Sequence, residues 1–259
     1  MKIVVCVKQV PDSAARLTAQ NGQANWGDAP LVINPWDEYA VEAALLQVEA
    51  QGGEVIAVSM GSESAKEALK HALAMGCSSA VLISDPAVAQ ADSQVTARLL
   101  AAAIQKMGPV DLAFFGRASI DSDTGLTPPQ TARLLGWPVL TLVAAITALD
   151  PAGRTIRVVR GIEEGRQTVT ANLPVVVSVI KEFAEPRYPS FLGIRKAGKA
   201  AIPTWTLADL DLSPLELAVS WPTFVNPPQR QVKTEMITGG SPQEIAEKLA
   251  DKILGEKVL

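Results

Sequence analysis

The chain has 259 residues, of which 48% are hydrophobic and 19% are charged, so it can build a sizeable core and is not disordered throughout. A formal net charge of -4 and 5% aromatic residues argue against a nucleic-acid partner, whose binding surface needs basic stripes or stacking rings. No uncharged apolar stretch reaches the roughly 20 residues of a membrane helix, and the first apolar run is too short for a signal peptide. We therefore expect a cytoplasmic protein without membrane insertion.

The first half of the chain alternates short apolar runs with helical patterns. Asn34 is a good helix N-cap and Pro35 suits the first helical position, and the apolar spacing after them continues to Gly52-Gly53. Strands are expected at residues 3–7, 31–33, 55–59, 80–83 and 110–115, with helices after Pro35, after Ser62, from Asp92 to Met107 and up to Leu135. This order predicts an α/β fold whose parallel sheet is covered by helices on both faces.

The pattern changes after Pro138. Four strand-like runs are linked by turns, and they are Val139–Ala148, Thr155–Arg160, Gln167–Ala171 and Val175–Ile180. We expect them to be antiparallel additions to the edge of the sheet.

From Glu185 onward, prolines interrupt the chain repeatedly, although Phe191, Trp205 and Trp221 keep it apolar. Such a segment is expected to lie extended on another protein surface rather than to be a free linker. The sequence thus predicts an α/β domain over residues 1–184 and an arm over residues 185–259. The arm ends in a helix that begins near Ser241.

The loop after the strand expected at residues 110–115, Gly116 to Thr127, carries the clearest chemical signal. It lies at the carboxyl end of a parallel strand, where ligands of α/β sheets bind, and its small and hydroxyl side chains lead into a helix. Backbone N–H groups in such a loop can bind phosphate, and Arg117 could add a charged contact. The alternative is a surface loop that only caps the helix. The strand ends at Cys6 and Met60 point to the same edge of the sheet.

Other chemistry finds little support in the sequence. Asp121 and Asp123 could hold a metal or act as an acid–base pair, but a capping loop shows the same spacing. With two cysteines and one histidine, we expect no metal site and no catalytic residue.

Several long motifs, in order along the chain, resemble one family. They are VKQVPDS, INPWDEYAVEAAL, EVIAVSMGSESAKEALKHALAMG, GRASIDSDTGLTPPQTARLLGWP, VVRGIEEGRQTVTANLPVVVSV and EPRYPSFLGIRKA. Together they are similar to the β subunit of electron transfer flavoproteins over roughly residues 1–199.

The resemblance implies a Rossmann-like domain and a heterodimer. It implies an α subunit that holds FAD, a nucleotide (AMP or a second FAD) in this chain, and electron transfer with acyl-CoA-type or other flavin dehydrogenases. The nucleotide-binding positions implied are Cys6, Asn34, Pro35, Trp36, Asp37, Met60, Gly116, Arg117, Ala118, Ser119, Ile120, Asp121, Ser122, Asp123, Thr124, Gly125, Leu126 and Thr127. Phe191 stands where the family carries the apolar side chain that anchors partner dehydrogenases.

The resemblance also bears on which nucleotide is bound. The VPDS start with Ser13, the EEG of Glu163 to Gly165, and the DSDT beginning at Asp121 favour FAD and the anaerobic, electron-bifurcating branch. Gly161 argues the other way, because the family usually has a glutamate there. Two alternatives remain from the residues alone: a nucleotide-sensing module and an adenylating α/β enzyme.

Overall fold

The computed structural model describes residues 1–213, 216–220, 223–228 and 234–256. These residues form two compact units, Met1–Phe224 and Val225–Leu259, and each is described by itself. The sequence placed a boundary after residue 184. The unit that holds the sheet continues beyond this point, because a strand and two buried leucines, Leu207 and Leu210, pack onto the body. Trp221 lies outside the described residues.

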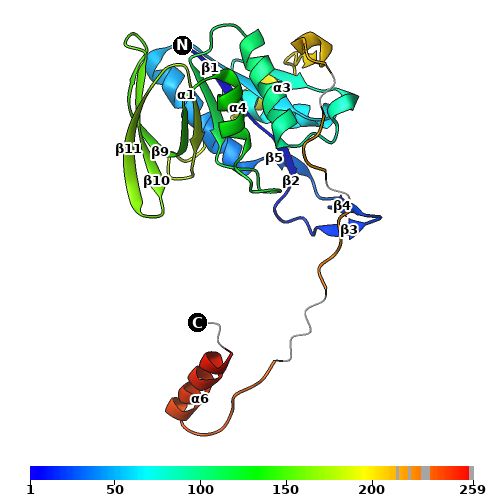
Figure 1. The fold of residues 1–259 in the computed structure, drawn as a ribbon, viewed down its shortest axis with the longest axis vertical. Coiled ribbons are helices and arrows are strands. Elements are labelled where there is room, and N and C mark those ends of the chain that lie inside the picture. The colour runs from blue at the N-terminus through cyan, green and yellow to red at the C-terminus, as the bar shows by residue number, and fades with distance from the viewer. Residues whose placement is uncertain (214–215, 221–222, 229–233, 257–259) are drawn as a thin grey trace. The chain divides into compact units, whose positions relative to one another are not determined.

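A nine-stranded sheet forms the centre of the first unit, in the order β11-β10-β9-β12-β8-β1-β6-β7-β13 (Figure 1). Its strands are β1 (Lys2–Cys6), β6 (Glu54–Met60), β7 (Ser79–Ile83), β8 (Leu112–Gly116), β9 (Val139–Asp150), β10 (Thr155–Ile162), β11 (Gly165–Asn172), β12 (Val175–Val179) and β13 (Thr204–Trp205). All neighbours from β9 through β12 to β13 are parallel, and only β10 pairs antiparallel, with β9 and β11. The predicted fold class is confirmed.

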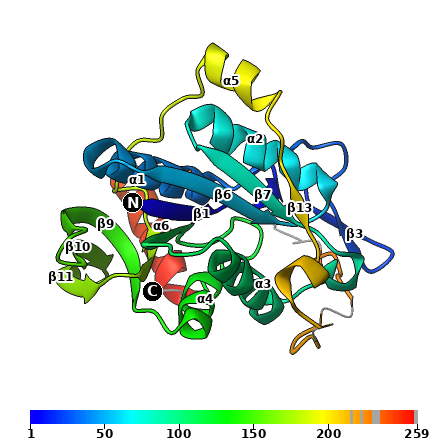
Figure 2. The same cartoon turned by 90° about the horizontal axis from the view of Figure 1, so that it is seen from above.

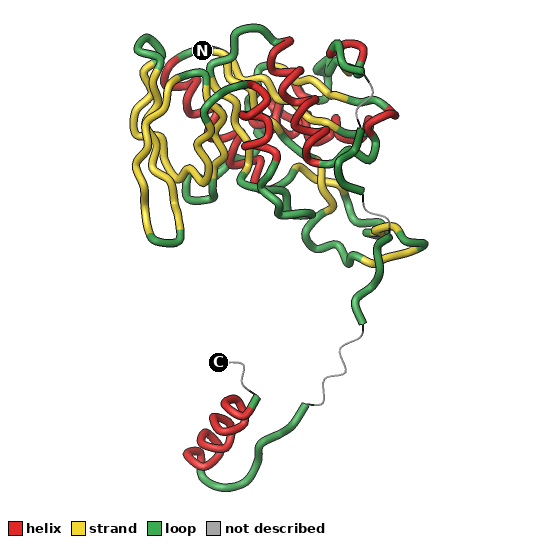
Figure 3. The backbone as a smooth tube through the Cα atoms, in the orientation of Figure 1, coloured by secondary structure: helices red, strands yellow, loops and turns green. Residues whose placement is uncertain are grey.

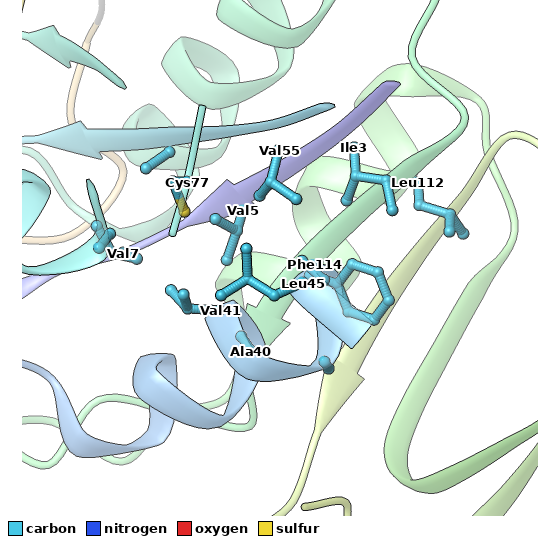
Figure 4. Packing of buried hydrophobic residues seen from close by; sticks show 14 of the residues in the cluster. Ile3, Val5, Val7, Ala40, Val41, Leu45, Val55, Cys77, Leu112 and Phe114 are labelled. Atoms are coloured by element: carbon cyan, nitrogen blue, oxygen red, sulfur yellow. The ribbon is translucent and has the colours of Figure 1, made fainter. Parts of the chain in front are cut away.

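Helices cover both faces of the sheet (Figure 2). One face carries α1 (Pro35–Gln51) and α2 (Lys66–Met75), and the other carries α3 (Ser93–Lys106) and α4 (Thr127–Leu135). Alternate residues of β1 serve the two cores, with Ile3 and Val5 in the first and Val4 in the second. Val5, Phe114 and Leu45 of α1 meet in the first core (Figure 4).

The order of the strands creates a switch point beside β1. The chain runs from β1 through α1 to β6 and through α2 to β7, and then returns through α3 to β8 on the other side of β1. The loops that follow β1 and β8 therefore diverge to opposite faces. This is the place where open α/β sheets form a crevice for ligands.

The prediction for Val175–Ile180 as an antiparallel edge strand was wrong. β12 is parallel to both β8 and β9 and lies inside the sheet. All five of its residues are buried, as expected for a parallel strand with both faces covered. Val139–Ala148 falls in β9, which pairs antiparallel with β10 as predicted, but its edge position was wrong, because β9 also pairs parallel with β12 and lies inside the sheet.

The segment between β1 and α1 forms two small sheets, of which only the strand at residues 31–33 was predicted (Figure 3). β2 (Gln9–Pro11) pairs with β5 (Leu31–Ile33), so residues 31–33 form a strand outside the main sheet. β3 (Thr18–Gln20) and β4 (Gln23–Asn25) form a hairpin.

The remaining elements are short, apart from the last helix. They are the 3-10 helices η1 (Glu63–Ala65), η2 (Pro86–Val88) and η3 (Ala208–Leu210), and the helices α5 (Phe191–Ala197) and α6 (Pro242–Gly255). α5 packs against α2, whereas α6 belongs to the second unit. Ser241 caps α6 in a capping box with Glu244, which explains its start. Among the described residues, no helix is both long and apolar enough to span a membrane.

Candidate functional site

A cleft of about 590 Å³ opens at the carboxyl ends of β1, β6 and β8. The last residues of these strands, Cys6, Met60 and Gly116, all line it. The cleft thus lies at the switch point beside β1, and its volume is within the range of ordinary small-molecule sites.

Asp37, in the first turn of α1, joins two strand ends beneath the cleft. Its Oδ2 accepts the backbone N–H of Lys8 at 2.8 Å, and the carboxylate also accepts the backbone N–H of Gly116. A β-carbon on Gly116 would lie 2.5 Å from Asp37 Oδ1 and 2.7 Å from the backbone of Trp36. Only glycine therefore allows α1 to approach the end of β8 so closely.

Burial dominates the electrostatics of Asp37. Burial raises the pKa of this carboxyl to about 7, and hydrogen bonds from Lys8, Asn34 and Gly116 lower it by a smaller amount. The side chain of Asn34, which precedes α1, connects this region to the loop after β8. Its Nδ2 donates to the Ala118 carbonyl at 2.9 Å, and its Oδ1 accepts the N–H of Ile120 at 3.1 Å.

The loop 116–127 is held by contacts among its own residues. The Asp123 N–H donates to the Ser119 carbonyl at 2.8 Å, and the hydroxyls of Ser119 and Ser122 lie 2.8 Å apart. Pro128 and Pro129 follow at the start of α4 and have no N–H. Backbone donors for an anion at this end of α4 must therefore come from the loop residues before Pro128.

Two cations near the loop are paired with its carboxylates. Lys8 Nζ lies 2.7 Å from Oδ2 of Asp121, and Arg117 Nη2 lies 2.9 Å from Oδ1 of Asp123. The Arg117 guanidinium also stacks 4.8 Å from the ring centroid of Trp36. A phosphate contact by Arg117 would require it to leave these partners.

The structure brings most of the predicted site residues together. Those that line the cleft are Cys6, Asn34, Asp37, Met60, Gly116, Ala118, Ser119, Ser122, Thr124, Gly125, Leu126 and Thr127. Those that do not are Pro35, Trp36, Arg117, Ile120, Asp121 and Asp123. Within the second group, Arg117 contacts Trp36 and Asp123, Asp121 pairs with Lys8, and Ile120 donates its N–H to Asn34.

One wall of the cleft was missed by the sequence analysis. Ala89, Ala91 and Asp92 come from the segment before α3, Ser93, Thr96 and Leu100 come from α3 itself, and Val219 comes from the later chain. A signal for the first group was present, because Asp92 is an N-cap in the connection that follows the parallel strand β7. The position of Val219 depends on tertiary structure alone.

The cysteines are unsuited to reaction or metal binding. Burial raises the pKa of the Cys77 thiol to about 12 and raises that of Cys6 further, with the charge of Asp37 adding to the effect on Cys6. Among the described residues, no group of three or more potential metal-ligating side chains is found.

An exposed apolar surface surrounds α5. Phe191 has 80% of its surface exposed, and Tyr188, Leu192 and Ile194 beside it are exposed too. Arg187 fixes the chain before α5, because its guanidinium binds the buried Glu42 at 2.8 Å and the exposed Glu49. These bonds raise the pKa of Arg187, with Glu42 contributing most.

α6 in the second unit has an apolar stripe but no buried residue. Leu249, Ile253 and Leu254 fall at helical spacing on it and are exposed. Nothing in the described part of this unit covers them.

Comparisons with known proteins agree with this architecture. A family model described as "Electron transfer flavoprotein domain" matches residues 27–210. The chain is 37% identical over 266 residues to the caffeyl-CoA reductase-Etf complex subunit CarD of Acetobacterium woodii, and the match covers all of both chains. It is 38% identical over 220 residues to the electron transfer flavoprotein subunit beta of Clostridium acetobutylicum, covering 85% of this chain and 83% of that protein. A third match, protein FixA of Azorhizobium caulinodans, is 37% identical over 249 residues, covering 92% of this chain and 88% of that protein.

The matched domain places the chain in the class of electron-transfer proteins. Within this class, the chain belongs to the electron transfer flavoprotein family as a β subunit.

Proposed function

We propose that the chain forms a heterodimer with an electron transfer flavoprotein α subunit and carries electrons between a dehydrogenase and a downstream acceptor. In this proposal the α subunit holds one FAD, and the cleft of this chain holds a nucleotide. The observation that carries the proposal is the convergence of three parallel strand ends, at Cys6, Met60 and Gly116, on one cleft at the switch point of the sheet.

The composition of the cleft fits a nucleotide. Ser119, Ser122 and Thr124 bring hydroxyls to one side, where they can donate to phosphate oxygens. Leu100 and Phe115 form an apolar part that suits an aromatic base. Gly125 has a φ of +62°, in the left-handed region, and the absence of a side chain lets a phosphate approach the backbone there.

The α subunit accounts for the apolar face of α6. An amphipathic helix without a buried residue gains stability when its apolar stripe packs into a groove of a partner. The exposed side chains on and beside α5 offer a separate apolar surface, which we assign to dehydrogenase docking. Caffeyl-CoA reductase in the name of one relative supports an acyl-CoA-type partner.

The nucleotide is FAD or AMP, and we favour FAD. VPDS, EEG and DSDT support FAD by resemblance. A flavin in the cleft would accept and return electrons, which would make the complex capable of electron bifurcation. With AMP the cleft would be structural, and the flavin of the α subunit would carry all the electrons.

The deciding experiment is a count of nucleotides. The chain is co-expressed with its α subunit, and the heterodimer is denatured in acid so that the released FAD and AMP can be quantified. Two FAD per heterodimer support the bifurcating form, and one FAD with one AMP supports the structural form. One FAD without AMP would contradict a nucleotide in the cleft.

The alternative functions are tested on the chain expressed with and without the α subunit. A nucleotide-sensing module should be a stable monomer without the α subunit. An adenylating enzyme should convert ATP to AMP-linked products. Neither behaviour is expected if the proposal is right.

A further inference from the structure

Residues 216–220, which we name the strap, reach the cleft from the later part of the first unit. Within the strap, Val219 lines the cleft opposite the strand ends, although it is far from them in sequence. The strap is therefore part of the cleft wall and not only a connection to the second unit.

A single carboxylate joins the strap to the wall formed by α3. Asp92 is the N-cap of α3, and its Oδ1 accepts the N–H of Val95 at 2.8 Å. Its Oδ2 accepts the N–H of Ala218 at 2.7 Å and that of Val219 at 2.9 Å. Both oxygens are thus used, one for the helix and one for the strap.

The carboxylate is suited to this role because it is charged. Partial burial raises the pKa of Asp92, but hydrogen bonds from the N–H groups of Val95, Val219 and Ala218 outweigh this effect, so the pKa of Asp92 lies below its usual value. Hydrogen bonds to an ionised acceptor are about twice as strong as neutral ones. The carboxylate also complements the positive end of α3.

The chain contains an internal counterpart of Asp92. Asp85 is the N-cap of η2, where its Oδ1 accepts the N–H of Ala87 at 2.9 Å. Its Oδ2 accepts the N–H of Leu207 at 3.1 Å, so it also ties the later chain to the body. Asp85 does not line the cleft, which makes it a matched control.

We propose that Asp92 is a positioning residue that holds the strap as the outer wall of the cleft and thereby sets how long a nucleotide stays bound. The inference rests on the proposed nucleotide site and adds to it a residue pair, Asp92 and Val219. The strap is tied to the cleft wall only through two N–H groups on one oxygen of Asp92 and the contact of Val219, among the described contacts of residues 216–220. Loss of the carboxylate therefore frees the strap while the rest of the cleft keeps its own bonds.

The coupling must act in both directions. If the strap retains the nucleotide, the nucleotide must equally stabilise the strap by thermodynamic linkage. The Ala218 and Val219 amides should then exchange their hydrogens more slowly when the cleft is filled.

The test compares Asp92→Asn with Asp85→Asn in the purified heterodimer. Asparagine is an equally good N-cap, so α3 and η2 keep their caps. Its side chain offers one acceptor oxygen, and its amide then faces the two strap N–H groups as a donor. The heterodimer is loaded with AMP in one arm and FAD in the other, and the release rate is measured after dilution into excess unlabelled nucleotide.

We expect Asp92→Asn to release the nucleotide about tenfold faster than wild type or more, because tenfold is the factor for one charge-assisted hydrogen bond and Oδ2 accepts two. Asp85→Asn should stay within about twofold. Hydrogen exchange at Ala218 and Val219 should rise in Asp92→Asn only. Val219→Ala, which keeps the Asp92 bonds, should also speed release. Equal release rates for the two asparagine variants would overturn the inference, whereas failure of wild type to bind either AMP or FAD would refute the proposed nucleotide site itself.

Discussion

Gly116 and Asp37 approach each other so closely that a β-carbon on Gly116 would lie 2.5 Å from Oδ1 of Asp37. The same atom would also lie 2.7 Å from the Trp36 carbonyl, which cannot move away without shifting α1. The end of β8 and the start of α1 are therefore fitted to each other at the base of the cleft.

Gly116→Ala should consequently destabilise the protein and loosen the cleft. Overpacking at a site bounded by backbone costs about 1–3 kcal/mol, and the displaced loop should lose nucleotide. The measurement is the melting temperature and nucleotide content of the heterodimer. Gly198→Ala is the control, because a β-carbon there meets nothing closer than 3.5 Å. Similar values for the two variants would contradict the close approach.

Asp37 should give the protein a distinctive pH dependence. Its folded pKa is raised to about 7, chiefly by burial, so the folded state binds a proton that the unfolded state releases near pH 4. Between these values the unfolded state binds fewer protons, and the free energy of unfolding falls as the pH rises. Above about pH 7 this contribution no longer changes.

Asp37→Asn removes that titration while keeping the shape of the neutral acid. Comparing denaturation midpoints of variant and wild-type heterodimers from pH 4 to 8 cancels the other titrating groups. We expect the denaturation midpoint of the variant, relative to that of wild type, to increase as the pH rises to about 7. A difference that does not change with pH would show that Asp37 ionises normally.

The sequence predicted the fold class and the site better than the topology of the edge. Strand-end reasoning found Cys6, Met60 and Gly116 because parallel strands end at one edge wherever they lie in the order. It misjudged β12, although the uninterrupted Val175-Val176-Val177 run is typical of a strand buried on both faces. Turn residues before that run suggested a hairpin, and only the tertiary fold shows that the chain passes to β8 instead.

Other features left no readable trace in the sequence. Val219 lines the cleft and donates its N–H to Asp92, and such a long-range pairing has no local pattern. The β3–β4 hairpin is polar and short, so its alternation is too weak to identify. The close contact of Gly116 with α1 likewise depends on the tertiary structure, because a glycine at the end of a strand can have several roles.

Substitutions of Lys8 and of Asp121 should have opposite effects on nucleotide affinity. Lys8 lines the cleft, but both oxygens of Asp121 accept hydrogen bonds from its ammonium, at 2.8 and 2.7 Å. Lys8→Met should weaken AMP or FAD binding and reduce its salt dependence, because a phosphate loses its nearest cation. Asp121→Asn should strengthen binding by freeing Lys8. The exposed Lys70→Met is the control, and calorimetric titration at two salt concentrations measures all three; equal affinities would remove Lys8 from the site.

The bond between Arg187 and Glu42 should govern the stability of the α5 surface. Glu42 is buried, and Arg187→Ala would leave its charge uncompensated, at a cost of about 3–5 kcal/mol for a fully buried pair and less here because Arg187 is partly exposed. Lys70→Ala, which breaks the exposed pair with Glu67, should cost about 0–1 kcal/mol. Chemical denaturation of both variants measures the two changes in the free energy of unfolding. If the two costs are equal, the Arg187 bond is no more than a surface ion pair.

Phe191 should act in docking and not in folding. Its side chain is 80% exposed at the start of α5, where Ser190 caps the helix and Gly193 packs against the Ala74 carbonyl of α2. The helix is thus held by other residues, and Phe191 is free to enter a partner pocket. Truncating a docking hot spot costs about 2 kcal/mol, so Phe191→Ala should raise the KM for the partner dehydrogenase roughly thirtyfold.

The control for Phe191→Ala is Leu134→Ala. Leu134 is an exposed leucine of α4 on the other face of the sheet, and its truncation should leave the KM unchanged. Flavin content and melting temperature should match wild type in both variants. A loss of flavin or of stability in Phe191→Ala, with an unchanged KM, would instead show that this side chain packs within its own heterodimer.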